Sequence, residues 1–271
     1  MAEQNKSENC GLPASGVLDL LNRMAEATET ETVWTLLVDA MAPFGFERVN
    51  YALTRGLAGT SIGDPHDVYI RSTHSPERVR AHHETGHYLR TAEYRWVLEN
   101  VGAVSWGWVA QERAAGRLSE SECAAMDSMQ ARRRRAGVSI SFAEGGRRYK
   151  GAMGLAAHEQ ESQEALDARW PDISARVMAI CNMAHLKFSH LPLPVRSACL
   201  NQRQRELLEW VADGKTMQDI QVLTGLSVSA IEKHLRKARD ALGVETTAQA
   251  VAKAAFLNLI FVASDMTETK G

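Results

Sequence analysis

Residues 227–242 read Ser-Val-Ser-Ala-Ile-Glu-Lys-His-Leu-Arg-Lys-Ala-Arg-Asp-Ala-Leu and decide how the C-terminal part of this chain folds. Ser227 is a favoured N-cap residue, and the apolar residues after it recur at intervals of four, three and four: Ile231, Leu235, Ala238 and Leu242. This spacing predicts one amphipathic helix with a single buried face. The opposite face then carries only polar and charged residues: Ser229, Glu232, Lys233, Arg236 and Lys237.

Three further helices are predicted around this one. Residues 201–212 carry an apolar stripe that stops at Asp213-Gly214. Thr216 with Asp219 resembles a capping box and opens a second helix, in which we expect Ile220 and Leu223 to point inward before Gly225 ends it. Thr246 with Gln249 opens a last helix, with a predicted inner stripe of Ala248, Val251, Ala255 and Leu259. Such a small helical unit can dock one helix in a DNA major groove.

This stretch, Leu200 to Val262, resembles the LuxR-type helix-turn-helix. The resemblance rests on Leu200 to Thr216 (LNQRQRELLEWVADGKT), Ile220 to Val244 (IQVLTGLSVSAIEKHLRKARDALGV) and Thr246 to Ala254 (TTAQAVAKA). It implies that Glu232, Lys233 and Arg236 occupy base-reading positions. Arg and Lys can donate to guanine and a carboxylate can accept from cytosine, whereas the alternative is an i,i+4 ion pair between Glu232 and Arg236. We expect phosphate contacts from Lys215, Thr216 and Lys237, so the predicted DNA-binding set is Lys215, Thr216, Ser229, Glu232, Lys233, Arg236 and Lys237.

Length and charge indicate two domains and one class of partner. The chain has 271 residues and a formal charge of −2, yet residues 200–262 hold eight Lys and Arg against seven Asp and Glu, a net of +1. Because so weak a positive charge gains little from counterion release, we expect a homodimer on double-stranded DNA.

Four Cys, at positions 10, 123, 181 and 199, match no zinc or redox spacing. The polar N-terminus and the lack of an 18-residue apolar run predict a soluble cytoplasmic protein without a membrane partner.

The N-terminal part mixes helical and strand patterns. Helical periodicity covers residues 13–41, strand alternation follows at Val49, Tyr51 and Leu53, and a short strand is predicted at 68–70. Helices are predicted for 76–90 and 92–100, and a further helix opens with the capping box of Ser119 and Glu122. It ends in four arginines, residues 132–135, which fit either nucleic acid or a solvated helix end.

A hairpin and a long helix complete this part. Residues 137–142 and 149–155 flank Gly145-Gly146 as two strands, and the Gly residues of the second strand suggest close approach of a ligand or backbone. A helix over 160–188 should be interrupted or kinked at Trp170-Pro171. The predicted fold class is therefore α+β: an N-terminal α/β/α sandwich around an antiparallel sheet, plus a C-terminal all-α four-helix helix-turn-helix. The expected domains are a tail at 1–12, a ligand-binding and dimerisation domain at 13–188, a linker at 189–199, a DNA-binding domain at 200–262 and a tail at 263–271.

The N-terminal domain resembles the autoinducer-binding domain of quorum-sensing LuxR proteins. The residues that carry this resemblance are Phe44 to Tyr51 (FGFERVNY), the helix after Ser75-Pro76, Val104 to Trp106 (VSW), Arg135 to Val138 (RAGV) and the hairpin. In that family a Tyr, a Trp, a second Tyr, an Asp and a further Trp hold an acyl-homoserine lactone. The resemblance places these roles at His74, Arg78, His82, Thr91 and Trp106 here, of which only Trp106 keeps the family's residue. Tyr51 and Met153 complete the predicted ligand-binding set.

Two interpretations of this altered pocket stay open. In one, the ligand differs, and His74, Arg78 and His82 receive a carboxylate or another acceptor-rich head group. In the other, the cavity has closed, Arg78 and His82 face solvent, and the protein dimerises without a ligand. Either way we expect a transcription regulator with no cofactor beyond a small-molecule signal, and no enzyme.

One motif suggests a different function. Residues 83–87, His-Glu-Thr-Gly-His, satisfy H-E-x-x-H, which on a helix would place two His on one face for zinc and a Glu as base. Gly86 weakens such a helix, and Arg90 and Glu93 stand where a longer zinc motif needs Gly and His. A zinc metallohydrolase with a DNA-binding domain is therefore a second, less favoured hypothesis.

Overall fold

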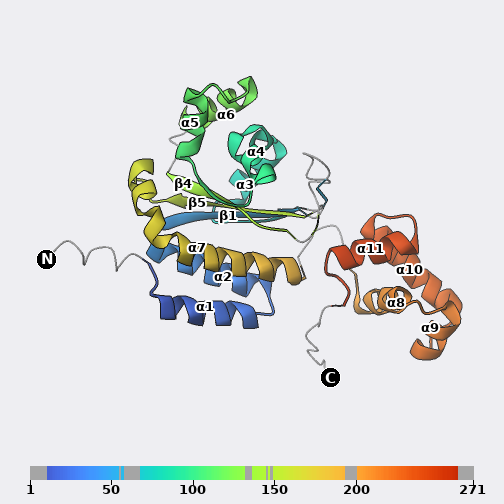
Figure 1. The fold of residues 1–271 in the computed structure, drawn as a ribbon. Helices are drawn as coiled ribbons and strands as arrows, with labels where there is room; N and C mark the ends of the chain where they lie inside the picture. Colours follow the sequence, from blue (N-terminus) through green and yellow to red (C-terminus); the bar gives the residue numbers. More distant parts are fainter. Residues whose placement is uncertain are drawn as a thin grey trace. The chain divides into compact units, whose positions relative to one another are not determined.

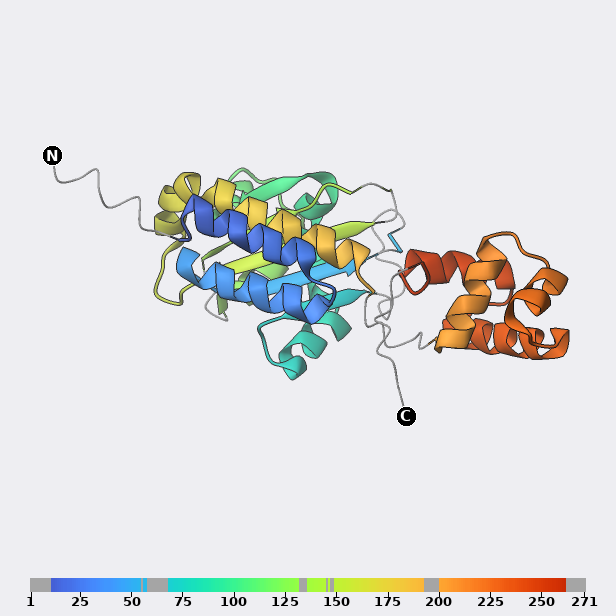
Figure 2. The ribbon, with the colours of Figure 1, turned by 90° about the horizontal axis from the view of Figure 1, so that it is seen from below.

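The computed structural model describes residues 11–54, 56–57, 68–131, 136–144, 146, 149–192 and 200–261, with residues 81–84, 87 and 129–131 described by their backbone alone. The chain forms two compact units, divided between Ser189 and His190. Figure 1 and Figure 2 show the helices and strands of both.

The first unit is built on a five-stranded antiparallel sheet of order β2-β1-β5-β4-β3. The strands are β1 (Phe46–Thr54), β2 (Tyr69–Ser72), β3 (Gly102–Ser105), β4 (Gly137–Ser141) and β5 (Lys150–Ala157). The predicted hairpin is confirmed, since β4 pairs with β5 in antiparallel register. Strand β3 was not predicted, because its four residues are too short to show an alternation.

Helices cover both faces of this sheet (Figure 1). On one side lie α2 (Thr30–Met41) and α7 (Gln163–His190), with α1 (Ala14–Glu26) outside them. On the other lie α3 (Pro76–Glu84), α4 (Ala92–Glu99), α5 (Gly107–Ala114) and α6 (Glu120–Ala131); the short 3₁₀ turns are Ala42–Phe44 and His87–Arg90. The predicted α/β/α sandwich is confirmed.

The main core of this unit lies between the sheet and α7. Six strand residues that point to α7 are at most 2% exposed: Val49, Tyr51, Leu53, Ile140, Met153 and Leu155. They meet a buried stripe of α7 that includes Val177, Ile180, Ala184 and Phe188. Helix α7 is continuous through Pro171 rather than interrupted, and Figure 1 shows its first turns (yellow) at an angle to the rest. Such a bend is expected where proline removes a helical hydrogen bond.

The helix predicted for residues 76–90 is wrong in its second half. Helix α3 ends at Glu84, and Gly86 adopts φ +60°, a left-handed conformation that glycine takes readily. A 3₁₀ turn, His87–Arg90, follows, and Thr91 then caps α4. The chain therefore changes direction at Gly86.

The second unit contains α8 (Gln202–Ala212), α9 (Met217–Thr224), α10 (Val228–Leu242) and α11 (Thr247–Phe256). The predicted caps at Thr216, Ser227 and Thr246 all form, and left-handed glycines end α9 and α10. The predicted inner stripe of α10 is confirmed, because Ile231, Leu235, Ala238 and Leu242 are at most 2% exposed.

Three inner positions in this unit, Leu223, Ala248 and Ala255, were predicted wrongly. Leu223 is 51% exposed although Ile220 is fully buried, because α9 is short and only one narrow face meets α10. In α11 the buried residues are Ala250 and Ala254, followed by Leu257, whereas Ala248 and Ala255 are exposed. Small alanines occupy both faces of α11, so hydrophobic periodicity could not tell the two apart.

Candidate functional site

The exposed face of α10 carries the residues predicted to read DNA. Ser229, Glu232, Lys233, Arg236 and Lys237 are all exposed, and Lys215 and Thr216 at the start of α9 are exposed as well. The helix is held from within by its buried stripe and at its start by Ser227, whose hydroxyl accepts from the Ala230 N–H. A rigid helix thus presents these polar side chains to solvent.

The ion pair considered for Glu232 and Arg236 does not form. Within the part of the chain that the structure describes, neither side chain has a salt-bridge partner, although Arg203 and Glu206 pair in α8 of the same unit. Both groups therefore remain available to bases. Thr216 is different, because its hydroxyl donates to Asp219 Oδ2 at 2.7 Å and accepts from the Asp219 N–H. This hydrogen bond holds the pKa of Asp219 below its ordinary value.

A hollow of about 550 Å³ runs along one flank of α10. It is lined by Ser229, Glu232, Lys233, Leu235, Arg236 and Arg239, together with Met217 and Thr247 at the first positions of α9 and α11. Arg239 and Thr247 were not among the predicted DNA-binding residues. Helical periodicity places Arg239 at the margin of the exposed face, so periodicity alone did not include it in the predicted DNA-binding set.

In the first unit, the sheet face toward α3–α6 differs from the face toward α7. Its strand residues alternate with the core residues, and the register pairs Asn50 with Gly154 and Ala52 with Ala152. These four small residues are half-buried, although helices lie over this face (Figure 1). A covered face that stays partly accessible and carries few large side chains is a candidate surface for a ligand.

Trp106 lies against this face. Its indole N–H donates to Ser139 Oγ at 2.9 Å, and an added Cβ at Gly154 would lie 3.9 Å from its ring. Gln163 fixes the backbone beside it, since its amide bonds both the N–H and the carbonyl of Gly137 and donates to Ser105 Oγ. Trp106 is thus the one aromatic residue of the predicted ligand set that the structure places on this face.

Tyr51 and Met153 lie on the opposite face and cannot share a pocket with Trp106. They are register partners on neighbouring strands, so their side chains point the same way. The Tyr51 hydroxyl is 2.9 Å from His185 Nδ1 of α7, and its ring lies 4.8 Å from that of Phe188. This part of the predicted ligand set is corrected: both residues belong to the core under α7.

The remaining predicted ligand residues are placed as follows. Arg78 is exposed on α3, and its neighbour Val79 is half-buried. His74 is half-buried just before α3, and the side chain of His82 lies outside the described residues. The Thr91 hydroxyl accepts from the Tyr94 N–H and donates to the Tyr88 carbonyl at 2.9 Å, so it serves as the cap of α4.

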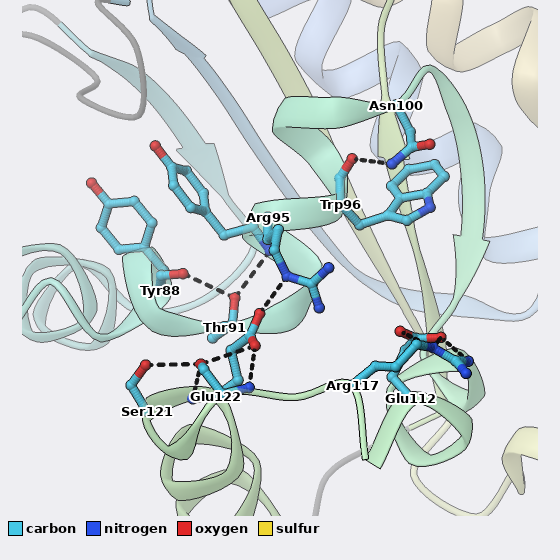
Figure 3. Close-up of polar contacts among 11 residues, drawn as sticks. Tyr88, Thr91, Arg95, Trp96, Asn100, Glu112, Arg117, Ser121 and Glu122 are labelled. Atoms are coloured by element: carbon cyan, nitrogen blue, oxygen red, sulfur yellow. Dashed lines mark hydrogen bonds and ion pairs between the residues drawn. The ribbon is translucent and has the colours of Figure 1, made fainter. Parts of the chain in front are cut away.

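A polar network ties α4 to α6 above the sheet (Figure 3). Arg95 Nε donates to Glu122 Oε1 at 2.7 Å, and the Glu122 carboxylate also accepts from the Ser119 N–H, which confirms the predicted capping box. Burial by itself raises the pKa of Glu122, but these hydrogen bonds outweigh it and leave the pKa below its ordinary value. Glu112 of α5, only 8% exposed, is bound by Arg117 in the same way. The Arg95–Glu122 pair thus joins α4 to α6, and the Arg117–Glu112 pair holds the turn after α5.

The structure gives no support to a zinc site at residues 83–87. Helix α3 ends at Glu84 and Gly86 is left-handed, so the five residues do not form the continuous turn that the motif needs. Among the residues whose side chains are described, no group of three His, Cys, Asp or Glu could hold a metal ion. The four arginines at 132–135 lie outside the described residues. No helix of the described ranges is long and apolar enough to cross a membrane.

Comparison with known proteins identifies both units. Residues 29–188 match the autoinducer binding domain family and residues 196–242 match sigma-70, region 4. The chain is 29% identical over 128 residues to the transcriptional activator SolR of Ralstonia nicotianae, covering 46% of this chain and 54% of that protein. It is 32% identical over 96 residues to the quorum sensing-dependent transcriptional regulator RpaR of Rhodopseudomonas palustris, covering 33% and 40%. The matched region thus spans about half or less of the length of these relatives.

Solved structures agree in fold. Escherichia coli SdiA aligns with a TM-score of 0.50 at 14% identity, covering 91% of this chain and 98% of that one. SdiA in complex with octanoyl-rac-glycerol aligns with a TM-score of 0.52 at 15% identity, covering 92% and 97%. The matched families and the curated relatives are those of transcription regulators rather than enzymes. Because the autoinducer-binding match alone covers more than half of the chain, this protein belongs to the LuxR-type quorum-sensing family, with an autoinducer-binding domain followed by a helix-turn-helix.

Proposed function

We propose that this protein is a transcription regulator whose first unit binds a small molecule and whose second unit binds DNA through α10. We assign residues 13–188 to the ligand-binding and dimerisation domain and residues 200–262 to the DNA-binding domain. The observation that carries the proposal is the exposed face of α10, where Glu232 and Arg236 have no partner in the described part of the chain. A helix with unpaired donors and acceptors on one face and a fully buried opposite face is suited to a major groove.

The proposed ligand lies between the sheet and the helices α3–α6. The central strand residues on that face are uncharged: Asn50, Ala52, Ile70, Ser72, Val104, Ser139, Ser141, Ala152 and Gly154. The two charged residues of this face, Arg48 and Lys150, lie toward the strand ends and donate to the backbone carbonyls of Thr73 and Asn100. Arg78, which could have bound a carboxylate, is exposed. Both observations favour an uncharged ligand with an apolar chain and a few amide or ester groups, such as an acyl-homoserine lactone or an acylglycerol, over a carboxylate.

DNA binding is proposed to require a homodimer. On α11, Ala248 and Ala255 are exposed and Val251 is half-buried beside them. Small apolar residues on one helix face permit close approach of a second copy. A two-fold dimer would set two copies of α10 about one helical turn of DNA, roughly 34 Å, apart on a two-fold-related site.

Binding of the purified protein to DNA from its own upstream region tests this function. Fluorescence anisotropy with that DNA and with a scrambled duplex, each with and without acyl-homoserine lactones and 1-octanoylglycerol, measures both partners. Arg236→Ala should remove most of the discrimination between the two duplexes, because each bidentate base contact contributes about 1–3 kcal/mol of discrimination. Equal binding of both duplexes by the wild type would disprove specific recognition through α10.

A regulator that works without a ligand is the second candidate, and one observation favours it. The Thr91 hydroxyl is engaged in capping α4, so it is poorly placed to hold a head group. This candidate predicts full DNA affinity for protein that was purified by refolding without any small molecule. Gly154→Leu would separate the two candidates. It projects into the space beside Trp106, and it should abolish a ligand response while leaving ligand-free DNA binding unchanged.

A further inference from the structure

Arg239 differs from Lys233 and Arg236 of the same helix in its exposure and in its hydrogen bonding. It is half-buried, whereas Lys233 and Arg236 are exposed, and its Nη1 donates to Thr247 Oγ1 of α11 at 3.0 Å. A guanidinium has five N–H groups, and this bond uses one of them. In the described part of the chain Arg239 has no carboxylate partner. The remaining donors therefore border the hollow with their charge uncompensated.

The position of Arg239 around the helix axis separates it from Arg236. Residues three apart on an α-helix differ by about 60° around the axis. Arg236 lies near the middle of the exposed face, and Arg239 is turned from it toward the flank where α9 and α11 begin. When a helix enters a major groove, its middle faces the base edges and its flanks face the phosphates.

The hollow offers a site of suitable charge on that flank. Its cations are Lys233, Arg236 and Arg239, and its carboxylate is Glu232, a net of +2. Met217, which also lines it, directly follows Lys215 and Thr216, the predicted phosphate contacts at the start of α9. The hollow therefore joins two segments, the starts of α9 and α11, along one side of the recognition helix.

We propose that Arg239, oriented by Thr247, is a DNA phosphate-binding residue, and that the hollow receives the sugar–phosphate backbone of one strand. The inference rests on the proposed DNA-binding function and extends it beyond the residues on the exposed face. Arg236 then reads sequence, whereas Arg239 contributes affinity and fixes the depth of α10 in the groove.

The salt dependence of DNA binding tests this assignment. For Arg239→Gln, the slope of log affinity against log salt concentration should become smaller by about 1, with roughly an eightfold loss of affinity at 0.1 M salt. The loss should be equal on upstream and scrambled DNA, because a phosphate contact carries no sequence information. Arg239→Lys should retain the wild-type slope. Thr247→Val should also retain it, with a smaller loss of affinity, because the charge stays but its orientation is lost.

Arg203→Gln is the matched control, since Arg203 lies on α8 outside the hollow and pairs with Glu206. It should leave slope and affinity unchanged, and circular dichroism melting verifies that each variant is folded. A wild-type slope for Arg239→Gln would overturn the inference and leave the proposed function standing. A loss confined to upstream DNA would make Arg239 a base-reading residue instead. Wild-type protein that binds no DNA would overturn both proposals.

Discussion

Two glycines of β5 provide a sharp test of which sheet face is packed and which is open. Gly151 faces α7, and a Cβ added there would clash with His185 Cε1 and lie 2.7 Å from its Nδ1. Gly154 faces the α3–α6 side, and its added Cβ would meet only Trp106, at 3.9 Å. Both are single-methyl changes in one strand, so they differ only in what the methyl group encounters.

For Gly151→Ala the His185 ring must move by about 1 Å to reach ordinary carbon contact distances. That ring is stacked on Phe142 at 4.2 Å and hydrogen-bonded to Tyr51 at 2.9 Å, so movement disturbs both contacts. Overpacking costs about 1–3 kcal/mol and loss of the hydrogen bond about 1 kcal/mol, offset by about 0.4–1 kcal/mol from the reduced freedom of the unfolded chain. We expect Gly151→Ala to lower the free energy of unfolding by about 1–3 kcal/mol.

Gly154→Ala should instead be neutral or stabilising by up to about 1 kcal/mol, because its methyl group fits without displacement. Urea denaturation followed by tryptophan fluorescence measures the difference, since five of the six Trp residues precede residue 190. With a slope of about 2 kcal/mol per M, the Gly151→Ala midpoint should fall by roughly 1 M. Equal midpoints for Gly151→Ala and wild type, or an equal loss for both variants, would refute the assignment of faces.

Three further measurements test contacts that stabilise each unit from within. The pKa of Glu122 is lowered in the folded state, so its carboxylate stabilises the fold above about pH 4.3, and this stabilisation is lost as pH falls through the folded pKa. Glu122→Gln should therefore be less stable than wild type at pH 7. A difference in stability that persists unchanged at pH 3 would contradict this. In thermal unfolding, Leu235→Ala should destabilise the second unit by about 2–5 kcal/mol and Leu223→Ala by less than about 0.5 kcal/mol, because of the two only Leu235 is buried. Similar losses of stability for the two variants would show that the Leu223 side chain is buried as well. Ser139→Ala should leave the Trp106 indole N–H without its acceptor and cost about 1–2 kcal/mol, and an unaltered urea midpoint would mean that this bond contributes nothing.

The local structure of the second unit follows from its amino-acid sequence. Ser227, the Thr216–Asp219 and Thr246–Gln249 boxes and Gly225 act on backbone groups a few residues away, so their hydrogen bonds depend on the chain nearby. The buried stripe of α10 was equally predictable, because large aliphatic residues recur on one face and polar residues fill the other. The same reasoning failed for Leu223 and for the alanines of α11, where only neighbouring helices decide which side is covered.

The tertiary structure decided which residues could line the ligand site. Alternation in β1 shows that Tyr51 and Asn50 face opposite sides, but both sides of this sheet carry helices, and only the packing of α7 reveals that Tyr51 belongs to the core. Likewise, spacing alone placed Arg78 in the pocket, whereas the orientation of α3 turns it to solvent. The role proposed for Arg239 depends on the packing of α11, which brings Thr247 beside it. Hydrogen bonds between neighbouring residues can be predicted from the local sequence, whereas burial and contacts between distant segments depend on how the helices and strands pack.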